Sequence, residues 1–498
     1  MRFILSIVFS LITLVSFASF KLSGKIVPST HTSLAINIPK VYSVYKKENQ
    51  AIKVQADGSF EVEIPLTEQK FAYLFVNDEK YLLLLKPNKQ LYIAINGSEN
   101  RITQLKGNSE PENQIIQSVD LADIPFFMKS EGNNYPYTKT TPEEVDSIVV
   151  KPWLAEQHKR LEIIRQSSLT KDDKALLTAE VKYNTLNHLC DFSSAIVRWK
   201  RADWNKFLIQ LYDTVSVATP SYARGLQYYL FVERYTKYLF SKALALHDQD
   251  SLYKEKPLRY LNISLDSALS LAKSHGETYL AWLAIHHTFD QATAEHFLAQ
   301  QTLDQYQYGD LTHLNPFFND FEKFFPHSSY YPELKQYADE LRHKLLSNRN
   351  NKTTEVFSGY DSVNSIYDVV NKIKGKVIYV DIWGTWCGPC KEELAHVPKL
   401  KEKFNGQDLI FVYIDMDEDD KDAEWQDFIR VNNMTGIHLR MTPTQIQSIW
   451  QELLPDQKEL RGQYPSYFIF DKQGNLVKGK AKRPSDKETL YQQLEKYL

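Results

Sequence analysis

Two cysteines separated by two residues, Cys387 and Cys390, are the residues of this chain whose type and spacing point most directly to chemistry. They follow the apolar run VIYVDIW and precede a predicted helix, so the first thiol lies at a helix N-terminus. Unpaired backbone N–H groups and the helix dipole stabilise a thiolate at such a position. The spacing lets the second sulfur reach the first and close a small ring, and Gly388 and Pro389 stiffen that ring. The pattern predicts a redox pair.

Half of a zinc site is the alternative explanation for two cysteines at this spacing. Zinc takes four ligands in its structural sites, and no second pair of Cys or His with ligand spacing lies nearby in the sequence. We therefore predict no metal and no diffusible cofactor. The third cysteine, Cys190, lies in a predicted helix, where a free cysteine packs like a small apolar residue.

Residues 1–18 have the pattern of a targeting signal. A positive charge at Arg2 precedes an apolar run from Phe3 to Phe17, and Ala18 supplies a small residue at a cleavage site. A bilayer span needs about 20 apolar residues, so the run favours a cleaved signal peptide over an uncleaved membrane anchor. We expect export to the periplasm, with membrane anchoring if the signal is not cleaved.

The composition narrows the class of protein further. The chain has 498 residues, which predicts two to four domains. Lys and Arg total 59 and Asp and Glu total 62, so the net charge of −3 argues against nucleic acid as a partner. Only three cysteines are present, whereas an exported scaffold held by disulfides has many. Hydrophobic cores must therefore hold the folds together.

The hydrophobic pattern changes character along the chain and predicts a multidomain protein. Residues 20–106 alternate apolar and polar side chains between turn signals, which predicts an all-β domain of the sandwich or barrel type. Residues 110–349 show helical spacing without a fixed repeat, which predicts an irregular α-helical domain. The polar segment 347–355 is predicted to be a linker. Helices are expected over 221–247, 257–274, 276–303 and 331–347, and others begin after the capping residues Thr141 and Thr170.

Residues 354–498 return to strands that alternate with helices. VIYVDIW and LIFVYIDMD are continuous apolar strands, a helix is expected from the cysteines to about Phe404, and YFIFDKQGNLV predicts a hairpin. The last helix is expected to be capped by Ser485. Such alternation predicts an α/β domain with a mostly parallel sheet covered on both faces.

The segment DIWGTWCGPCK closely resembles the active-site segment of thioredoxin-fold proteins. Its context resembles the exported TlpA/ResA-like thiol–disulfide oxidoreductases, because Gly-Thr-Trp precedes the first cysteine and a late proline follows an extra helix–strand segment. The resemblance covers residues 354–498. The β and helical regions before it resemble the layout of multidomain thioredoxin-like proteins from Bacteroidetes.

The resemblance implies a role for each cysteine. Cys387 would be the exposed nucleophile that attacks the disulfide of a partner protein, and Cys390 the buried thiol that resolves the mixed disulfide. Trp386 would flank the pair as an apolar contact. Pro465 matches the family's cis-proline opposite the cysteines, and a cis bond would turn the backbone of Tyr464 towards a substrate strand.

Two acids could exchange a proton with the buried thiol. Asp381 lies in mid-strand, on a face of the sheet that is expected to be buried because both faces are covered. A buried carboxyl group has a raised pKa. Its position matches the buried Asp of thioredoxins. Glu393, three residues after Cys390, falls on the apolar stripe of the helix and resembles the active-site Glu of ResA-like proteins. Which acid carries the proton is open. The family often has a proline where this chain has Ala395, so the helix near Glu393 departs from the pattern.

The function implied is a periplasmic thiol–disulfide oxidoreductase that acts on disulfide-bearing envelope proteins. The Gly-Pro dipeptide resembles that of thioredoxin, whose potential is about −270 mV, so reduction is favoured over oxidation. A periplasmic reductase needs an electron donor, and we expect a membrane thiol carrier; cytochrome c-type biogenesis is one role the resemblance allows. The alternative is an envelope binding or scaffold protein in which the thioredoxin-like domain is an adaptor.

Overall fold

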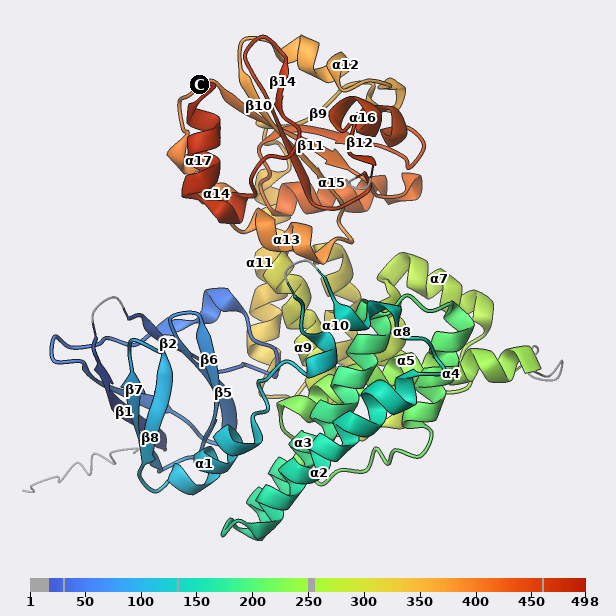
Figure 1. The fold of residues 1–498 in the computed structure, drawn as a ribbon. Helices are drawn as coiled ribbons and strands as arrows, with labels where there is room; N and C mark the ends of the chain where they lie inside the picture. The colour runs from blue at the N-terminus through green and yellow to red at the C-terminus, as the bar shows by residue number, and fades with distance from the viewer. Residues whose placement is uncertain (1–17, 30–31, 132–133, 250–255, 459–460) are drawn as a thin grey trace, which may run out of the picture. The chain divides into compact units, whose positions relative to one another are not determined.

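The computed structural model describes residues 18–29, 32–131, 134–249, 256–458 and 461–498 (Figure 1). The chain divides into two compact units, one up to Gln300 and one from Gln301 to Leu498. The predicted signal peptide lies almost entirely outside the described residues. Among the helices that the structure describes, none combines the length and apolar character needed to cross a bilayer.

The first unit opens with two four-stranded sheets. Their orders are β4-β1-β7-β8 and β3-β2-β5-β6, and β1 with β7 is the parallel pair among antiparallel ones. Apolar side chains from both sheets, such as Leu22, Leu74 and Leu83, form one shared core. The all-β prediction is confirmed in the form of a sandwich. The strands are β1 Ser19–Val27, β2 Leu34–Asn37, β3 Gln50–Ala51, β4 Ser59–Pro65, β5 Lys70–Val76, β6 Glu79–Leu85, β7 Gln90–Asn96 and β8 Arg101–Lys106.

One of the turn signals in residues 20–106 is Asp57-Gly58; a turn is present there, and Gly58 has a φ of 83° that favours glycine. The strands on its two sides do not pair with each other. Strand β3 pairs with β2 in one sheet, whereas β4 pairs with β1 in the other. Alternation alone does not specify which sheet a strand joins, so the sequence pattern could not show this.

Helices form the rest of the first unit, as predicted. Thr170 caps α3, because its side chain accepts a hydrogen bond from the backbone N–H of Asp173. The continuous helix expected over 276–303 is wrong: it breaks at Phe289, which lies between α8 and α9. The helices are α1 Glu110–Val119, α2 Lys151–Gln166, α3 Lys171–Asp191, α4 Arg201–Tyr212, α5 Leu226–Gln249, α7 Leu265–His275, α8 Glu277–Thr288 and α9 Gln291–Tyr308, which runs across the division between the units.

The second unit begins before the predicted linker. Helices α10 (Leu311–Phe324) and α11 (Tyr331–Asn348) pack against α15 (Asp422–Val431). The segment 347–355 is also fastened there, because the side chain of Asn348 donates to the carbonyl of Arg430 at 3.0 Å. The compact unit that contains the cysteines therefore also includes α10 and α11, since a polar segment can bind another surface by hydrogen bonds.

The rest of the second unit is a six-stranded sheet of order β14-β13-β10-β11-β12-β9. Strands β9 to β12 are parallel, and β13 and β14 are antiparallel additions. One buried cluster with Trp450 covers one face and another with Trp425 covers the other, as the continuous apolar strands predict. The remaining elements are β9 Thr354–Val356, α12 Tyr367–Val370, β10 Val377–Trp383, α13 Gly388–Leu394, α14 Val397–Lys403, β11 Leu409–Asp415, β12 Gly436–Arg440, α16 Ile446–Leu453, β13 Ser466–Phe470, β14 Leu476–Lys478 and α17 Glu488–Glu495.

Candidate active site

The two cysteines lie where the central strand β10 passes into helix α13, and they form a disulfide. Cys387 is the N-cap of α13, and its sulfur accepts the backbone N–H of Cys390 at 3.2 Å. An N-terminal position with a donated N–H is the arrangement that stabilises a thiolate once the disulfide is reduced. The structure is thus the oxidised form of the predicted pair.

The exposure of the first cysteine differs from the expectation. Cys387 is 5 % exposed and Cys390 is 1 % exposed, so neither sulfur lies open on the surface in the disulfide form. Both belong to the buried cluster around Trp383 and Trp425. The expectation of an exposed nucleophile is therefore wrong for the oxidised state, although Cys387 remains the more accessible of the two. The reason is packing, because both cysteine side chains belong to the core that covers one face of the sheet.

Two aromatic rings border the pair. Trp386 is 59 % exposed, and its ring meets the ring of Tyr464 edge to face, with 5.3 Å between centroids. Gly384 permits this packing, because a Cβ on it would lie 2.7 Å from the indole of Trp386. Within the motif Gly388 is half-buried and Pro389 is exposed.

Pro465 is brought next to the strand that carries the motif. Strand β13 begins at Ser466, which is paired with Ile382 of β10. The Tyr464–Pro465 peptide bond is cis, as predicted. The register therefore places Pro465 and Tyr464 at the same edge of the sheet as the cysteines.

Asp381 is buried in mid-strand, as its alternation with Val377, Tyr379 and Trp383 predicts. Burial, together with the charge of Glu393, raises the pKa of Asp381 well above its ordinary value. Within the described part of the chain no hydrogen-bond donor reaches its Oδ1 atom. A carboxyl group in this state favours its protonated form.

Glu393 is also buried, but it is held on both oxygens. Oε2 accepts the backbone N–H of Ser485 at 2.9 Å, and Oε1 accepts the hydroxyl of the same residue at 2.8 Å. Arg483 lies 4.0 Å from Oε1. The prediction that Ser485 caps the last helix is wrong. Helix α17 begins at Glu488, and both the backbone N–H and the hydroxyl of Ser485 donate to Glu393 instead.

The helix that carries Glu393 is interrupted soon after it. Helix α13 ends at Leu394, and α14 starts at Val397 with Pro398 in its first turn. The single helix expected to run to about Phe404 is therefore two short helices. Proline has no backbone N–H, and N–H groups in the first turn of a helix have no partner within the helix. Pro398 therefore fits the start of α14 without the loss of a hydrogen bond.

Asp417 is a residue of the site that the sequence reasoning missed. Its carboxylate accepts the backbone N–H of Thr385 at 2.9 Å and also the hydroxyl of Thr385. Thr385 belongs to the loop that leads into the cysteines, so Asp417 fixes the path of that loop. The signal was available: the carboxyl ends of parallel strands meet at one edge, and an acidic run follows β11.

Comparison with known proteins agrees with this geometry. Residues 375–476 match the family model described as thioredoxin-like. The carboxyl-terminal part of this chain is a thioredoxin-like domain. The predicted fold class is therefore confirmed, with a β-rich region and a helical region before that domain.

The thioredoxin-like domain is similar to curated oxidoreductases. The thiol–disulfide oxidoreductase ResA of Bacillus thuringiensis (strain Al Hakam) is 29 % identical over 105 residues, which cover 21 % of this chain and 54 % of that protein. The chain thus spans about half the length of that relative. A thioredoxin of Coprinus comatus is 26 % identical over 112 residues, covering 20 % of this chain and 97 % of that one.

Solved structures of the same kind are also similar. The thioredoxin domain of a thiol-disulfide oxidoreductase from Bacteroides vulgatus is 20 % identical, with a TM-score of 0.22, covering 26 % of this chain and 82 % of that chain. A thiol-disulfide oxidoreductase from Bacteroides fragilis NCTC 9343 is 15 % identical, with a TM-score of 0.20, covering 25 % and 83 %.

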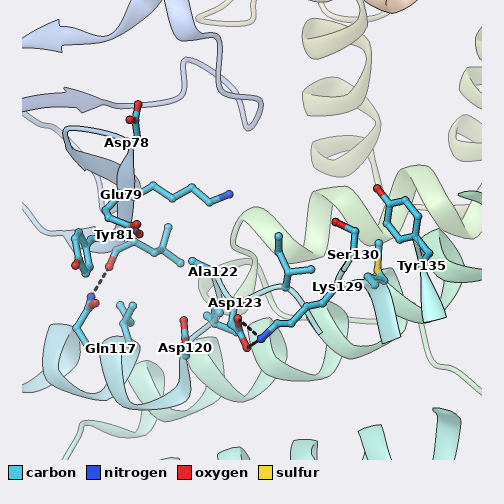
Figure 2. Close-up of a pocket in the computed structure, with 16 residues that line it drawn as sticks. Asp78, Glu79, Tyr81, Gln117, Asp120, Ala122, Asp123, Lys129, Ser130 and Tyr135 are labelled. Atoms are coloured by element: carbon cyan, nitrogen blue, oxygen red, sulfur yellow. Dashed lines mark hydrogen bonds and ion pairs between the residues drawn. The ribbon is translucent and has the colours of Figure 1, made fainter. Parts of the chain in front are cut away.

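The first unit holds a hollow of its own, of about 830 Å³, between β6 and the segment after α1 (Figure 2). Asp78 and Glu79 lie on one side of it, and Ser130 and Tyr135 on the other. Lys129 and Asp123 form an ion pair at 3.2 Å on its wall. Charged and apolar side chains share the lining, and the hollow is open to the surface, which is typical of a surface contacted by a partner rather than of an enclosed catalytic cavity.

Proposed function

We propose that the protein is a thiol–disulfide oxidoreductase that reduces disulfides of other proteins through Cys387 and Cys390. The observation that carries the proposal is the disulfide between these residues at the N-terminus of α13. The similarity of residues 375–476 to thioredoxin-like proteins supports the same reaction class. Trp386 and Tyr464 supply an apolar border for a client segment.

The first step is attack by the Cys387 thiolate on one sulfur of a client disulfide. A bond forms between Cys387 and that client sulfur, while the bond between the two client sulfurs breaks and the other client sulfur leaves as a thiolate. The helix N-terminus stabilises the attacking thiolate, because the backbone N–H of Cys390 points at the sulfur of Cys387. The product of this step is a mixed disulfide.

The second step releases the client. Cys390 gives its proton to a base and attacks the sulfur of Cys387, which re-forms the disulfide and expels the second client thiolate. The client has then gained two electrons and the protein pair has lost two. A dithiol donor must reduce the pair again, and a membrane thiol carrier is the donor we propose.

We assign the proton transfer to Asp381. Its Oδ1 atom has no hydrogen-bond donor among the described residues, so it can accept a proton without breaking an existing contact. Both oxygens of Glu393 are occupied by Ser485. Glu393 acts instead as an anchor for the turn at Ser485, and its charge, added to the effect of burial, strengthens the affinity of the Asp381 carboxylate for a proton by raising the pKa of Asp381.

The periplasm is the proposed location, because residues 1–18 have the pattern of a signal peptide. The clients are then disulfide-bearing envelope proteins. Reduction is the proposed direction because the Gly-Pro dipeptide matches that of a strongly reducing protein.

Trapping with a Cys390→Ser variant tests the proposal. Without the resolving thiol the second step stops, so Cys387 stays joined to its clients. Exposure of the reduced full-length variant to oxidised envelope proteins should yield adducts that dithiothreitol releases and mass spectrometry identifies. The expected yield is at least tenfold above that of the wild-type protein.

Cys387→Ser is the matched control, since it removes the attacking sulfur and keeps the size of the side chain. It should trap no client. Equal trapping by both variants, or none by Cys390→Ser, contradicts the proposal.

A second candidate function is binding of an envelope partner by the first unit. The hollow beside β6 favours it, because acidic residues outnumber basic ones on its wall, which suits a cationic partner. The acids are Asp78, Glu79, Asp120 and Asp123, and the bases are Lys80 and Lys129. Partners that the Cys387→Ser control retains without a covalent bond would support this function.

A further inference from the structure

Lys391, the residue after the second cysteine, is fastened by a carboxylate from outside the matched thioredoxin-like residues. Its Nζ atom lies 2.8 Å from Oδ2 of Asp310, and the exposed fractions of the two side chains are 10 % and 4 %. Asp310 directly precedes α10, within the same compact unit as α13. Loss of either partner of a buried ion pair leaves an unpaired charge away from water, which is strongly destabilising. Each side chain therefore holds the other in place.

Asp310 is built into its position by further contacts. It caps α10 by accepting the backbone N–H of His313 at 3.1 Å, and the Nδ1 atom of the same histidine lies 2.9 Å from its other oxygen. Burial alone would raise the pKa of Asp310, but the charge of Lys391 and the contact with His313 hold that pKa well below its ordinary value. Burial would lower the pKa of His313, but its contact with Asp310 and, to a smaller degree, the charge of Glu424 in α15 raise that pKa. Asp310 is therefore an ionised carboxylate.

Lys391 lies one helical turn from the first cysteine. Its backbone N–H donates to the carbonyl of Cys387 at 3.1 Å, and residues four apart share one face of a helix. The ammonium group sits between the rings of Tyr308 and Phe428, 5.5 Å from each centroid. It cannot swing freely, so its charge stays beside the N-terminal turn of α13.

We propose that Asp310 is a positioning residue for the redox pair: it holds the ammonium group of Lys391 against α13 and offsets its charge, so that the helical segment at α10 sets how strongly the Cys387 thiolate is stabilised. The inference rests on the proposed exchange through Cys387. It makes α10 part of the working redox domain, although that helix lies before the matched residues 375–476.

The direction of the effect follows from the charges. Removing the carboxylate takes away the ion-pair partner of Lys391, so more of its positive charge stabilises a thiolate at Cys387 and favours the reduced pair. Removing the cation leaves the carboxylate of Asp310 with His313 as its partner, which makes the site more negative and favours the disulfide. The two changes must therefore move the redox equilibrium in opposite directions.

The test measures the equilibrium constant of the full-length protein with glutathione for Asp310→Asn, Lys391→Met and the double variant. Asn keeps an oxygen that can cap α10. We expect Asp310→Asn to shift the equilibrium about threefold towards the dithiol, which corresponds to about 14 mV at 29.6 mV per tenfold change. Lys391→Met should shift it about threefold towards the disulfide, and the double variant should return close to wild type.

Asp339→Asn is the matched control, because Asp339 is a solvent-exposed aspartate of α11 paired with Lys335. It should leave the equilibrium unchanged. Shifts of equal sign in both single variants, or no shift in either, overturn the inference, and opposite shifts cannot come from loss of folding. Because the equilibrium is measured without a client, failure here is distinct from failure of the client trapping, which tests the proposed function itself.

Discussion

Asp381 is a carboxyl group in a cluster of aromatic side chains, and its environment sets its chemistry. It lies on the face of β10 that also presents Tyr379, and its register partner on β13 is Tyr467. Burial raises the pKa of Asp381, so the folded protein binds its proton more tightly than the unfolded chain does. The ionised form is therefore a cost that the fold bears at neutral pH.

Asp381→Asn should remove that cost. A raised carboxyl pKa contributes stability below the unfolded value and loses it as pH rises through the folded value. We expect the free energy of unfolding of the oxidised variant to rise relative to that of the wild type as pH rises. The difference should reach roughly 1–3 kcal/mol at pH 8. Chemical denaturation at pH 4, 6 and 8 measures the difference.

The control for this prediction is Asp408→Asn, since Asp408 is an exposed aspartate of the same unit that lies 3.3 Å from Lys472. A difference between Asp381→Asn and wild type that stays constant with pH would rule out a protonated Asp381. Slower resolution of the mixed disulfide in Asp381→Asn is the matching expectation for catalysis.

At the scale of elements, the junction of α3 and α5 shows the same physics in the first unit. Glu180 of α3 is fully buried and accepts the backbone N–H of Gln227 at 3.0 Å, near the start of α5. Burial raises the pKa of Glu180 to about 7 despite those hydrogen bonds. Gly225 is required beside it, because a Cβ there would lie 2.6 Å from the carboxyl carbon of Glu180.

Glu180→Gln should therefore flatten the pH dependence of the first unit. Stability from this group is complete below about pH 4.5, the ordinary value, and is lost as pH rises through about 7. Relative to the variant, the wild-type protein should lose on the order of 2–3 kcal/mol between pH 5 and pH 8. Denaturant unfolding of both proteins across that range gives the difference.

Glu162→Gln supplies the comparison for this junction. Glu162 lies on the surface of α2, and its hydrogen bonds with Arg165 and Gln166 lower its pKa to about 2, outside the tested range. It should show the wild-type pH dependence. An identical dependence for Glu180→Gln and wild type would show that Glu180 does not titrate in the folded unit.

At the scale of the whole molecule, local signals in the sequence were sufficient for the element types and for the core of the site. The alternation of β10 predicted a buried Asp381, and the motif itself predicted the disulfide between Cys387 and Cys390. These features depend on neighbours within a few residues, where periodicity and helix-terminus chemistry act directly.

The features that the sequence could not predict depend on tertiary contacts. Ser485 meets Glu393 across 92 residues, and Lys391 meets Asp310 across 81. Nothing in the local pattern marks such partners, because any polar residue can satisfy a distant one once the fold brings them together. The same reason explains why α10 and α11 belong to the compact unit that contains the cysteines.

The proposed exchange depends most on the reactivity of Cys387, whose side chain is largely covered in the oxidised form. The direct measurement is alkylation of the reduced, folded, full-length protein with iodoacetamide at pH 7, read by mass spectrometry of its peptides. Cys387 should react first, at least tenfold faster than Cys390 and than Cys190, which is buried in α3. If Cys387 reacts as slowly as Cys190 until the protein is unfolded, the pair cannot attack a client and the account is wrong.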